Sequence, residues 1–464
     1  MPGGIWETQN KILPGIYINF KSRPGLLASI GDRGVVAIPK LLNWGINDEL
    51  IEIRTLEDVY PKLGYDVSAP QMQFLREILL GTTLTQGASR VLIANLATIG
   101  GVAATATIDN LTVTANSKGI RGNDISIVIT PDIDTEISAE TYAVFTVETI
   151  LDGTVQDRQV IGSFTDAANN VPAKVSDLVK NNWVTFSGTA SALITPTAGL
   201  PLAGGINGTL APTAYSNFMT LLEQKTFNVV IYDGDDPIQQ SAFALFVQRL
   251  SYGSGRYCQA VMANYPNADN ETVISVKNGY ALNDGSVLTP QQAAWWVGGA
   301  TAGAKNNQSL TYGVHQNAIR AVPRLSKAEL EEAVTEGSFA FFEEYDKVKV
   351  ITDINTFTSF TVDKGKSFKK NRVIRVLFSI ANDIYRVYSL YYVGKVDNDN
   401  DGRKLLKAEI VGYMNQLQGN GAIQNFVADD IEVLPGIDSD SVIINVAAWP
   451  NDAIEKIYIQ VTVS

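Results

Sequence analysis

The sequence predicts a multidomain chain that combines α/β and α+β regions with an inserted β-rich domain. Its 464 residues exceed one typical hydrophobic core and 45% of them are apolar, so several packed domains are expected. One stretch of the chain holds short alternating runs separated by turn residues, and another alternates between helix and strand patterns. These patterns predict a sandwich-like insertion and an α/β core, respectively.

The chain opens with a segment that we interpret as an arm, residues 1–24. In KILPGIYINFKSRPG, an extended chain places Ile16, Ile18 and Phe20 on one side and Tyr17 on the other. A Pro-Gly pair stands on each side of this predicted strand, and no second strand follows across a tight turn. The strand is therefore expected to pair with something outside its own neighbourhood.

Residues 25–97 mix strands and helices and predict an N-terminal α/β domain. Apolar residues at helical spacing, from Met72 to Leu79, predict an amphipathic helix. The run SRVLIANLA is apolar throughout and predicts a buried strand.

Residues 98–206 predict the inserted, sandwich-like β domain. Thr, Ala, Val and Asn dominate this stretch, and alternating runs such as NDISIVITP follow one another. In ILDGTVQDRQV, Asp152-Gly153 separates two such runs and predicts a hairpin. The run AKVSDLVKNN predicts the one helix of the insert.

Residues 207–347 predict an α/β domain with a mainly parallel sheet. Apolar strands such as FNVVIYDGDD alternate with helices, one of which Pro237 can start. The apolar helix TPQQAAWWVGGATAGAKNN carries small residues that suit close packing. Cys258 is the single cysteine, which excludes an internal disulfide framework, and its context predicts a buried strand.

Residues 348–464 predict an α+β domain that ends in a second arm, residues 455–464. A long helix beginning in SFKKNRVIRV is followed by an Asp/Asn loop, a second helix and three strands. The last run, EKIYIQVTVS, has the cleanest alternation in the chain, with Ile457, Ile459, Val461 and Val463 on one face.

The charge of the chain argues against two classes of partner. The formal net charge is −12, which repels nucleic-acid backbones and anionic lipids, so neither nucleic acid nor direct lipid binding is expected. No secretory signal pattern and no membrane-spanning apolar run are present. Synthesis in a cytoplasm follows as the expectation.

The sequence predicts no catalytic, metal or cofactor site, although three features resemble parts of such sites. The single histidine, His315, lacks a G-x-S-x-G serine, and the acidic loop from Asp233 to Asp236 follows a strand, where α/β enzymes place ligands. In DNDNDGRKLLKAEI the carboxylates from Asp397 to Asp401 fit the start of a calcium loop, but its twelfth position is Ala408. A turn that caps the next helix is favoured. A hydrolase and a calcium-dependent surface protein remain the alternative functions.

Two groups of basic residues stand out in this acidic chain. Arg403, Lys404 and Lys407 lie in the first turns of a predicted helix, where cations oppose the macrodipole. Either the upstream Asp run compensates them or they face an acidic partner. The other group, six cations between Lys364 and Arg375, predicts either a solvated face or contact with an acidic neighbouring subunit.

Neither arm is expected to be ordered alone. Burying four aliphatic side chains gains ~6–12 kcal/mol, whereas fixing eight backbone residues costs ~8–16 kcal/mol. Each hydrogen bond between strands adds about 1 kcal/mol of stabilisation. The net free energy of ordering an arm on its own is therefore near zero. An arm then orders where a sheet edge of another subunit receives it, or else both ends complete the chain's own sheets.

Long collinear segments carry a family resemblance. They are GGIWETQNKILPGIYINFKS, NNQSLTYGVHQNAIRAVPRLSKAELEEAVTEGSFAF, DINTFTSFTVDKGKSFKKNRVIRVL, YYVGKVDNDNDGRKLLKAEIVGYMNQLQGNGAIQNF and NDAIEKIYIQVTV. In these segments the sequence resembles the contractile-tail sheath proteins of phages and phage-derived particles, in the branch found in Gram-positive bacteria and their prophages. The resemblance covers both ends and most of the chain, except the insert.

The resemblance implies a structural role without catalysis, metal or cofactor. Sheath subunits stack as hexameric rings in a helical tube around a tail tube, and contraction drives that tube through a cell envelope. The α/β domain of the family resembles subtilisin in fold. The terminal strands would link subunits, and the helix Arg403–Leu417 would face the tube through Arg403, Lys404 and Lys407.

The same resemblance implies the partners and the setting. They are further copies of the chain, the tail tube protein, and baseplate and tail-terminator proteins. Synthesis would occur in a host bacterial cytoplasm, with assembly into a virion tail or a phage tail-like particle. The sequence leaves an infectious phage, a defective prophage and a bacteriocin open.

Overall fold

The computed structural model describes residues 3–4, 16–17, 30–31, 33–132, 144–162, 173–192 and 194–462. The chain divides into two compact units. The smaller unit comprises Met1–Gly31 and Asn382–Asn451, and the larger comprises Asp32–Ala381 and Asp452–Ser464. No helix among the described residues is long and apolar enough to cross a membrane.

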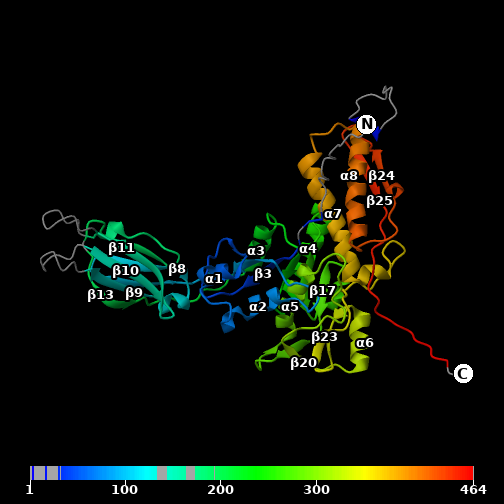
Figure 1. The fold of residues 1–464 in the computed structure, drawn as a ribbon. Coiled ribbons are helices and arrows are strands. Elements are labelled where there is room, and N and C mark those ends of the chain that lie inside the picture. Colours follow the sequence, from blue (N-terminus) through cyan, green and yellow to red (C-terminus); the bar gives the residue numbers. More distant parts are fainter. Residues whose placement is uncertain are drawn as a thin grey trace. The chain divides into compact units, whose positions relative to one another are not determined.

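A seven-stranded sheet forms the centre of the larger unit (Figure 1). All neighbouring strands are parallel except the edge pair β4–β5. Strands from both sides of the insert meet here, because β15 pairs with β3. In sheet order the strands are β21 (Ser338–Phe339), β17 (Val273–Val276), β16 (Gln259–Ala263), β15 (Val229–Ile231), β3 (Val35–Lys40), β5 (Arg90–Asn95) and β4 (Leu50–Ile53).

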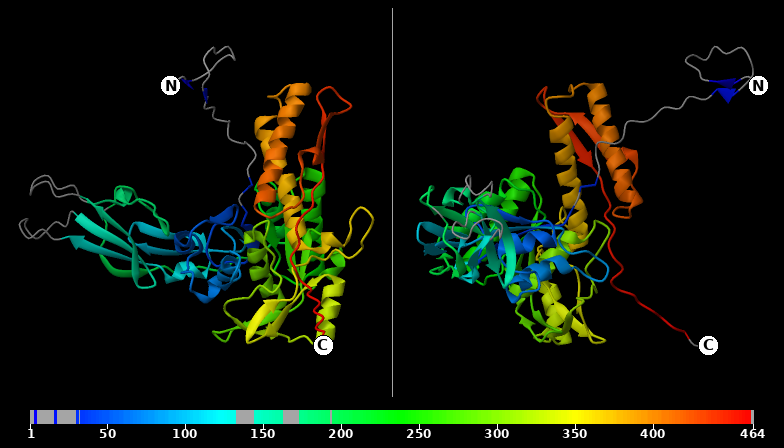
Figure 2. Two further views of the ribbon diagram at one scale, coloured as in Figure 1. Left: turned by 45° about the vertical axis from the view of Figure 1, so that its right-hand side comes forward. Right: turned by 60° about the vertical axis from the view of Figure 1, so that its left-hand side comes forward.

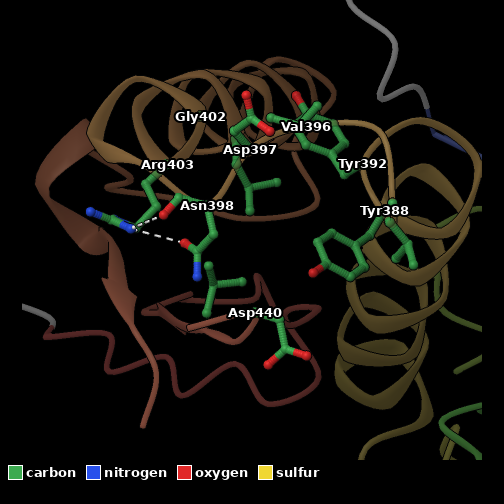
Figure 3. Close-up of a pocket in the computed structure, with 12 residues that line it drawn as sticks. Tyr388, Tyr392, Val396, Asp397, Asn398, Gly402, Arg403 and Asp440 are labelled. Atoms are coloured by element: carbon green, nitrogen blue, oxygen red, sulfur yellow. Dashed lines mark hydrogen bonds between the residues drawn. The ribbon is translucent and has the colours of Figure 1, made fainter. Parts of the chain in front are cut away.

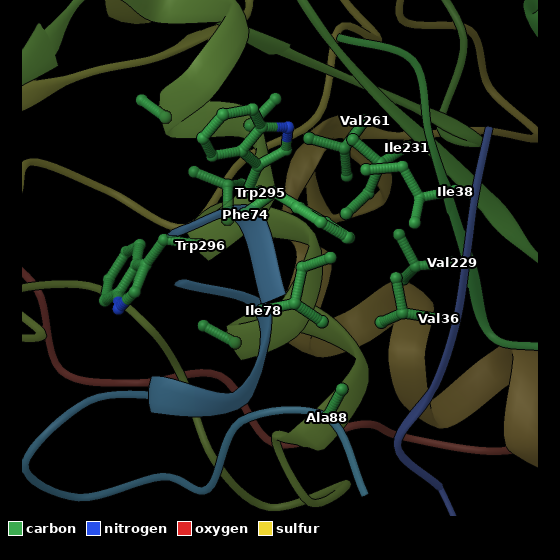
Figure 4. Packing of buried hydrophobic residues seen from close by; sticks show 14 of the residues in the cluster. Val36, Ile38, Phe74, Ile78, Ala88, Val229, Ile231, Val261, Trp295 and Trp296 are labelled. Carbon is green, nitrogen blue, oxygen red and sulfur yellow. The ribbon is translucent and has the colours of Figure 1, made fainter. Parts of the chain in front are cut away.

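Helices cover both faces of this sheet because its strands are apolar on both sides. Val36 and Ile38 pack in one cluster with α2 and α5 (Figure 4). Ala37 packs in another cluster with α3 and α4. This alternation follows from the two-residue period of a strand. The helices are α2 (Gln73–Leu80), α3 (Ala214–Leu222), α4 (Pro237–Gln248) and α5 (Pro290–Gly303).

Small residues bring α5 close to α2, as the sequence predicted. A Cβ atom at Gly299 would lie 2.0 Å from the Ile78 carbonyl oxygen, and one at Gly303 would lie 2.1 Å from that of Gly87. Any larger side chain at these positions would therefore force the helices apart. The predicted Pro237 start of α4 is also confirmed, with Asp236 as the N-cap residue.

The insert forms a sandwich of two antiparallel sheets. The predicted hairpin at Asp152-Gly153 is confirmed, since both residues have positive φ angles, 53° and 71°. One sheet has the order β11-β10-β9-β13 and the other β12-β8-β7. Their bounds are β7 (Ala103–Ile108), β8 (Leu111–Lys118), β9 (Ser126–Asp132), β10 (Val144–Leu151), β11 (Thr154–Ile161), β12 (Val184–Gly188) and β13 (Thr197–Pro201).

The helix predicted from AKVSDLVKNN is wrong. Only one 3₁₀ turn forms, Val175–Asp177. The chain then leaves the helical path because Val179 exchanges two hydrogen bonds with the Gln159 side chain, at 2.9 and 2.7 Å. A side chain on a neighbouring strand thus decides the local structure.

Smaller elements complete the larger unit. Two helices, α1 (Val59–Leu63) and α6 (Lys327–Glu336), accompany short strand groups. These groups are β6 (Ala97–Ile99) with β14 (Thr209–Leu210), β22 (Phe341–Glu344) with β23 (Lys347–Val350), and β18 (Gly279–Leu282) between β19 (Val287–Leu288) and β20 (Ala318–Val322).

In the smaller unit, a hairpin packs against α8 (Asn400–Gly419) (Figure 2). The hairpin consists of β24 (Ile431–Pro435) and β25 (Val442–Val446). The predicted apolar stripe of this helix, Leu406, Ile410, Tyr413 and Leu417, is buried. The long helix α7 spans Asn371–Tyr391 and starts later than the sequence indicated, after a 3₁₀ turn at Lys366–Lys369.

The two terminal segments have different pairing. Strand β2 (Ile16–Tyr17) pairs in parallel with β1 (Gly3–Gly4), an intrachain partner that the sequence analysis did not foresee. Ile18, Phe20 and Val463 lie outside the described residues. Residues 455–462 form no strand in the subunit.

Candidate assembly site

The single histidine lies in a closed polar cluster beneath α2 and α5. His315 Nδ1 accepts hydrogen bonds from the backbone N–H groups of Asn317 and Ala318, at 3.2 and 3.1 Å. Its Nε2 therefore carries the proton and donates to Glu77 Oε2 at 2.8 Å. Tyr280 donates to the same oxygen at 2.6 Å. Both ring nitrogens are thus engaged in holding the core together.

The acidic loop at the carboxyl end of β15 is engaged in the same way. Asp233 Oδ2 accepts from Lys40 Nζ at 2.6 Å and from Trp295 Nε1 at 2.8 Å. The Lys40 amine also lies over the rings of Phe74 and Trp295, with centroids 5.3 and 4.8 Å away. Asp236 caps α4 by accepting from the Ile238 N–H group. At the position where α/β enzymes place ligands, these two acidic side chains therefore bind other groups of the same chain.

The Asp/Asn loop before α8 is a helix cap, as the sequence favoured. Asp399 accepts hydrogen bonds from the N–H groups of Asp401 and Gly402, at 3.0 and 2.7 Å. These bonds hold the pKa of Asp399 below its ordinary value of 3.8. Within the described part of the chain, no group of three or more His, Cys, Asp or Glu side chains could hold a metal ion.

The three cations of α8 differ in their surroundings. Arg403 turns back and donates to Asn398 and Asn400, at 2.7 to 3.0 Å. Lys404 pairs with Asp401 at 3.1 Å, but its side chain stays 77% exposed. Lys407 is half-buried. The upstream loop thus partly compensates the cations, and Lys404 carries the charge that a partner can reach.

A cavity of about 340 Å³ lies beside Arg403 within the smaller unit (Figure 3). Tyr388 of α7 and Tyr392, just after that helix, line one side, and Asp440 lies on the hairpin side. The two tyrosine rings are stacked, with centroids 6.3 Å apart. The first turn of α8 is therefore part of a surface that combines aromatic, cationic and acidic groups.

Four of the six cations between Lys364 and Arg375 have intrachain partners, whereas Lys366 is exposed. Contact of this segment with an acidic neighbouring subunit stays a prediction. Lys369 donates to the carbonyl groups of Val334 and Thr335 at the end of α6, at 2.6 and 3.0 Å. The remaining pairs are Lys364 with Glu271, Lys370 with Glu455, and Arg375 with Asp353 and the Gln308 carbonyl group.

The C-terminal segment presents apolar side chains to solvent. Ile457, Ile459 and Val461 are 76%, 81% and 79% exposed. Glu455, just before them, was not singled out from the sequence, yet it accepts hydrogen bonds from three side chains of the larger unit. Its only sequence signal is an acidic residue at the base of a strictly alternating run.

Comparison with known proteins decides the family. Four family models match successive parts of the chain. They are the tail sheath protein Gp18 domain III N-terminal region (residues 33–96), the phage tail sheath protein beta-sandwich domain (100–207), its central domain (208–356) and the phage tail sheath C-terminal domain (363–464). The phage-like element PBSX protein XkdK of Bacillus subtilis (strain 168) is 33% identical over the full length of both chains.

The chain belongs to the phage tail sheath protein family. The crystal structure of a sheath tail protein from Desulfitobacterium hafniense is 42% identical, covers 96% of this chain and 99% of its own, and has a TM-score of 0.79. The helical sheath of the anti-feeding prophage in its contracted state is only 11% identical. It covers 97% and 99% of the two chains with a TM-score of 0.55, so the sheath fold persists where little sequence is shared.

Proposed function

We propose that the protein is the structural subunit of a contractile tail sheath. In this proposal it polymerises as stacked hexameric rings in a helical tube around a tail tube, and the contracting lattice drives that tube through a target cell envelope. Membership of the phage tail sheath family supports the role. The single structural observation that carries it is the row of exposed apolar side chains on the C-terminal segment.

The arms are the proposed links between subunits. Ile457, Ile459 and Val461 alternate along an extended chain, so a sheet edge could bury all three on one face. Burying a side chain of this kind stabilises by ~1.5–3 kcal/mol. The full set of arm residues proposed here is Ile16, Tyr17, Ile18, Phe20, Ile457, Ile459, Val461 and Val463.

The hairpin β24–β25 is the proposed receiving edge. Among the described residues, each of its strands pairs on one side only, which leaves a row of backbone donors and acceptors for an incoming strand. Inner-face residues Val433 and Ile444 are only half-buried. A donated strand would cover this partly open apolar face.

The first turns of α8 are the proposed contact with the tail tube, through Arg403, Lys404 and Lys407. The exposure of Lys404 supports this assignment. Further copies of the chain, the tube, and baseplate and tail-terminator proteins are the proposed partners. We place synthesis in the host bacterial cytoplasm and assembly in a tail or tail-like particle.

A hydrolase or a calcium-dependent protein is not favoured. Glu77, Asp233 and Asp399 each serve a structural contact already described. The parallel sheet with helices on both faces agrees with a subtilisin-like architecture used as scaffold, which remains part of the proposal together with the domain boundaries near residues 24, 97, 206 and 347.

Electron microscopy of the purified protein tests the proposal. The full chain is expected to form rings or tubes at high concentration, and a variant that lacks residues 457–464 is expected to stay a folded monomer. Circular dichroism of both proteins controls for folding. Monomers of the full chain at every concentration would contradict the sheath role, and normal tubes from the truncated chain would contradict the arm assignment.

A further inference from the structure

We propose that two carboxylates, the partly buried Glu455 and the buried Asp383, hold the roots of the two terminal arms and so determine where each arm becomes free. They act as positioning residues, because they touch the arm roots rather than the neighbouring subunit. This inference rests on the proposed exchange of arms between subunits. It adds the points at which each arm is held by its own subunit.

The C-terminal root is held by a three-sided socket in the larger unit. Glu455 Oε1 accepts from Thr311 Oγ1 at 2.8 Å, and Oε2 accepts from Thr352 Oγ1 at 3.2 Å. Lys370 Nζ forms an ion pair with Oε2. The side chains of Glu455 and Lys370 are only 16% and 23% exposed, so the pair is less screened than one on an open surface.

A deeper network holds the socket in shape without help from the arm. Thr311 Oγ1 accepts from the Asp353 N–H group at 2.9 Å. The Asp353 side chain is 1% exposed and accepts from the Leu310 N–H group at 3.1 Å and from Asn371 at 3.0 Å. The Thr311 donor that meets Glu455 is therefore already in place, which lowers the entropic cost of docking the root.

Beyond this socket every described residue is exposed. Glu455 is largely covered between two exposed neighbours, Ile454 at 87% and Lys456, and the exposure continues from Lys456 to Thr462. On the other side, Asn451 donates through its backbone to the Ala422 carbonyl group at 2.9 Å. The chain thus leaves the smaller unit after Asn451, is clamped by the larger unit at Glu455, and is free from Lys456 onward.

The N-terminal root is held in the smaller unit. The Gly31 N–H group donates to both Asp383 oxygens, at 3.1 and 3.0 Å, and Tyr413 donates to Oδ2 at 2.9 Å. A Cβ atom at Gly31 would lie 2.4 Å from Asp383 Oδ1, so any other residue here would displace the carboxylate. Arg386 also pairs with Asp383 at 3.4 Å.

The two arms are therefore fastened to different units of the same subunit. A pulling force on the C-terminal arm would act on the contacts of Glu455 with the larger unit. It would not be transmitted along the chain to β25. Tension on the N-terminal arm is taken up at Asp383 by the smaller unit. This arrangement lets the segments outside the two anchors change direction during contraction while the units keep their internal packing.

Spin labels test the C-terminal root. Cysteines replace Ala453 and, separately, Ile459; the native Cys258 is buried, and burial raises the pKa of its thiol to about 12, so it does not compete for the label. In Glu455→Ala the ratio of mobile to immobile signal at position 453 is expected to rise at least about tenfold, because hydrogen bonds to a charged group are lost. The signal at position 459 is expected to stay mobile throughout.

Three variants control this measurement. Lys370→Met is expected to free position 453 as Glu455→Ala does, Lys370→Arg is expected to keep it immobile, and Lys456→Gln changes a charge one residue along without effect. Thermal unfolding reports whether each variant folds. Equal mobility at position 453 in the parent protein and in both Glu455→Ala and Lys370→Met would overturn the C-terminal anchor.

Limited trypsin digestion tests the N-terminal root. Cleavage after Arg33 requires local opening, and Gly31→Ala is expected to speed it at least about tenfold, because the added methyl group displaces the Asp383 carboxylate. Gly419→Ala is the matched control, since a Cβ atom there meets nothing within 4 Å. Equal cleavage rates in the two variants would overturn the N-terminal anchor.

The truncation that lacks residues 457–464 separates this inference from the proposed function. If the truncated chain still forms tubes, the exchange of arms itself is wrong. If truncation blocks assembly while Glu455→Ala neither frees position 453 nor slows tube growth, only the anchor is wrong. Slow tube growth from a folded Glu455→Ala protein, together with a mobile root, is the expected result.

Discussion

The two basic groups of this chain contrast sharply, although their sequences suggest similar roles. The cations from Lys364 to Arg375 lie in the larger unit and mostly pair within it, whereas Arg403, Lys404 and Lys407 lie in the smaller unit around the first turns of α8. Arg375 is fully buried, but Lys404 is 77% exposed. The first group therefore contributes pairs inside the subunit, whereas the second keeps a strongly exposed cation at Lys404.

Burial explains why the same residue types behave differently. In the first group, burial lowers the pKa of Lys369 from its ordinary value of 10.5, and its amine contacts two helix-terminal carbonyl groups instead of solvent. In the second group, the Lys404 amine remains hydrated and pairs with a neighbouring exposed carboxylate, that of Asp401. A charge in this chain therefore signals a partner only where the fold has not already supplied one.

The largest effect is expected for Arg375→Met, which breaks a fully buried pair. The change leaves Asp353 charged without its guanidinium partner and leaves the Gln308 carbonyl group without a donor. The free energy of unfolding of the larger unit is expected to fall by ~3–5 kcal/mol, as measured by denaturant titration. If the free energy of unfolding fell by less than about 0.5 kcal/mol, as for a typical surface substitution, the pair would not be structural.

The next effect is expected for Lys369→Met. This change removes the donor from the carbonyl groups of Val334 and Thr335 at the end of α6. The loss in the free energy of unfolding is expected to be ~1–3 kcal/mol, the contribution of hydrogen bonds from a charged donor to these partly buried acceptors. Denaturant titration beside Lys366→Met, whose side chain is exposed, provides the matched comparison, and equal stability of the two variants would contradict the prediction.

Charge reversal at the second group is expected to separate assembly from stability. Replacing Arg403, Lys404 and Lys407 by Glu is expected to lower the free energy of unfolding by less than about 1 kcal/mol. Growth of sheath on purified tail tubes is expected to weaken strongly and to show less salt dependence. Sheath growth equal to that of the parent protein would return these residues to a local role at the helix cap.

The smallest effect is expected for Lys404→Ala alone. Its exposed pair with Asp401 is expected to contribute between 0 and ~0.5 kcal/mol to the free energy of unfolding. Thermal unfolding of this variant and of Arg375→Met then compares an exposed and a fully buried cation of these two groups. A loss above about 1 kcal/mol would mean that Lys404 has a structural contact that the subunit fold does not explain.

Local patterns predicted the elements whose cause is local. The hairpin at Asp152-Gly153, the start of α4 at Pro237 and the apolar stripe of α8 all depend on residues a few positions apart. The same reasoning failed for the helix expected after Ala173, because the Gln159 side chain binds the chain at Val179. A contact from another strand outweighed the local helical preference.

Which charged residues pair with each other could not be predicted from the sequence, for a related reason. Glu271 and Lys364 are 93 positions apart, and Lys370 and Glu455 are 85 positions apart. No spacing rule links residues at such distances. Asp383 and Glu455 were overlooked because a single acidic residue carries no pattern, whereas the tertiary structure makes each of them a shared acceptor.

The sequence by itself indicated the family through its long collinear segments, and composition and periodicity along the chain predicted the α/β layering, the sandwich insert and the alternation of the last residues. The tertiary structure alone decided which cations pair internally, that His315 and Asp233 serve the core, and that a clamp at Glu455 precedes the exposed arm. The physical reason is burial. Whether a polar group is paired, neutralised or left for a partner depends on neighbours that only folding brings within hydrogen-bond distance.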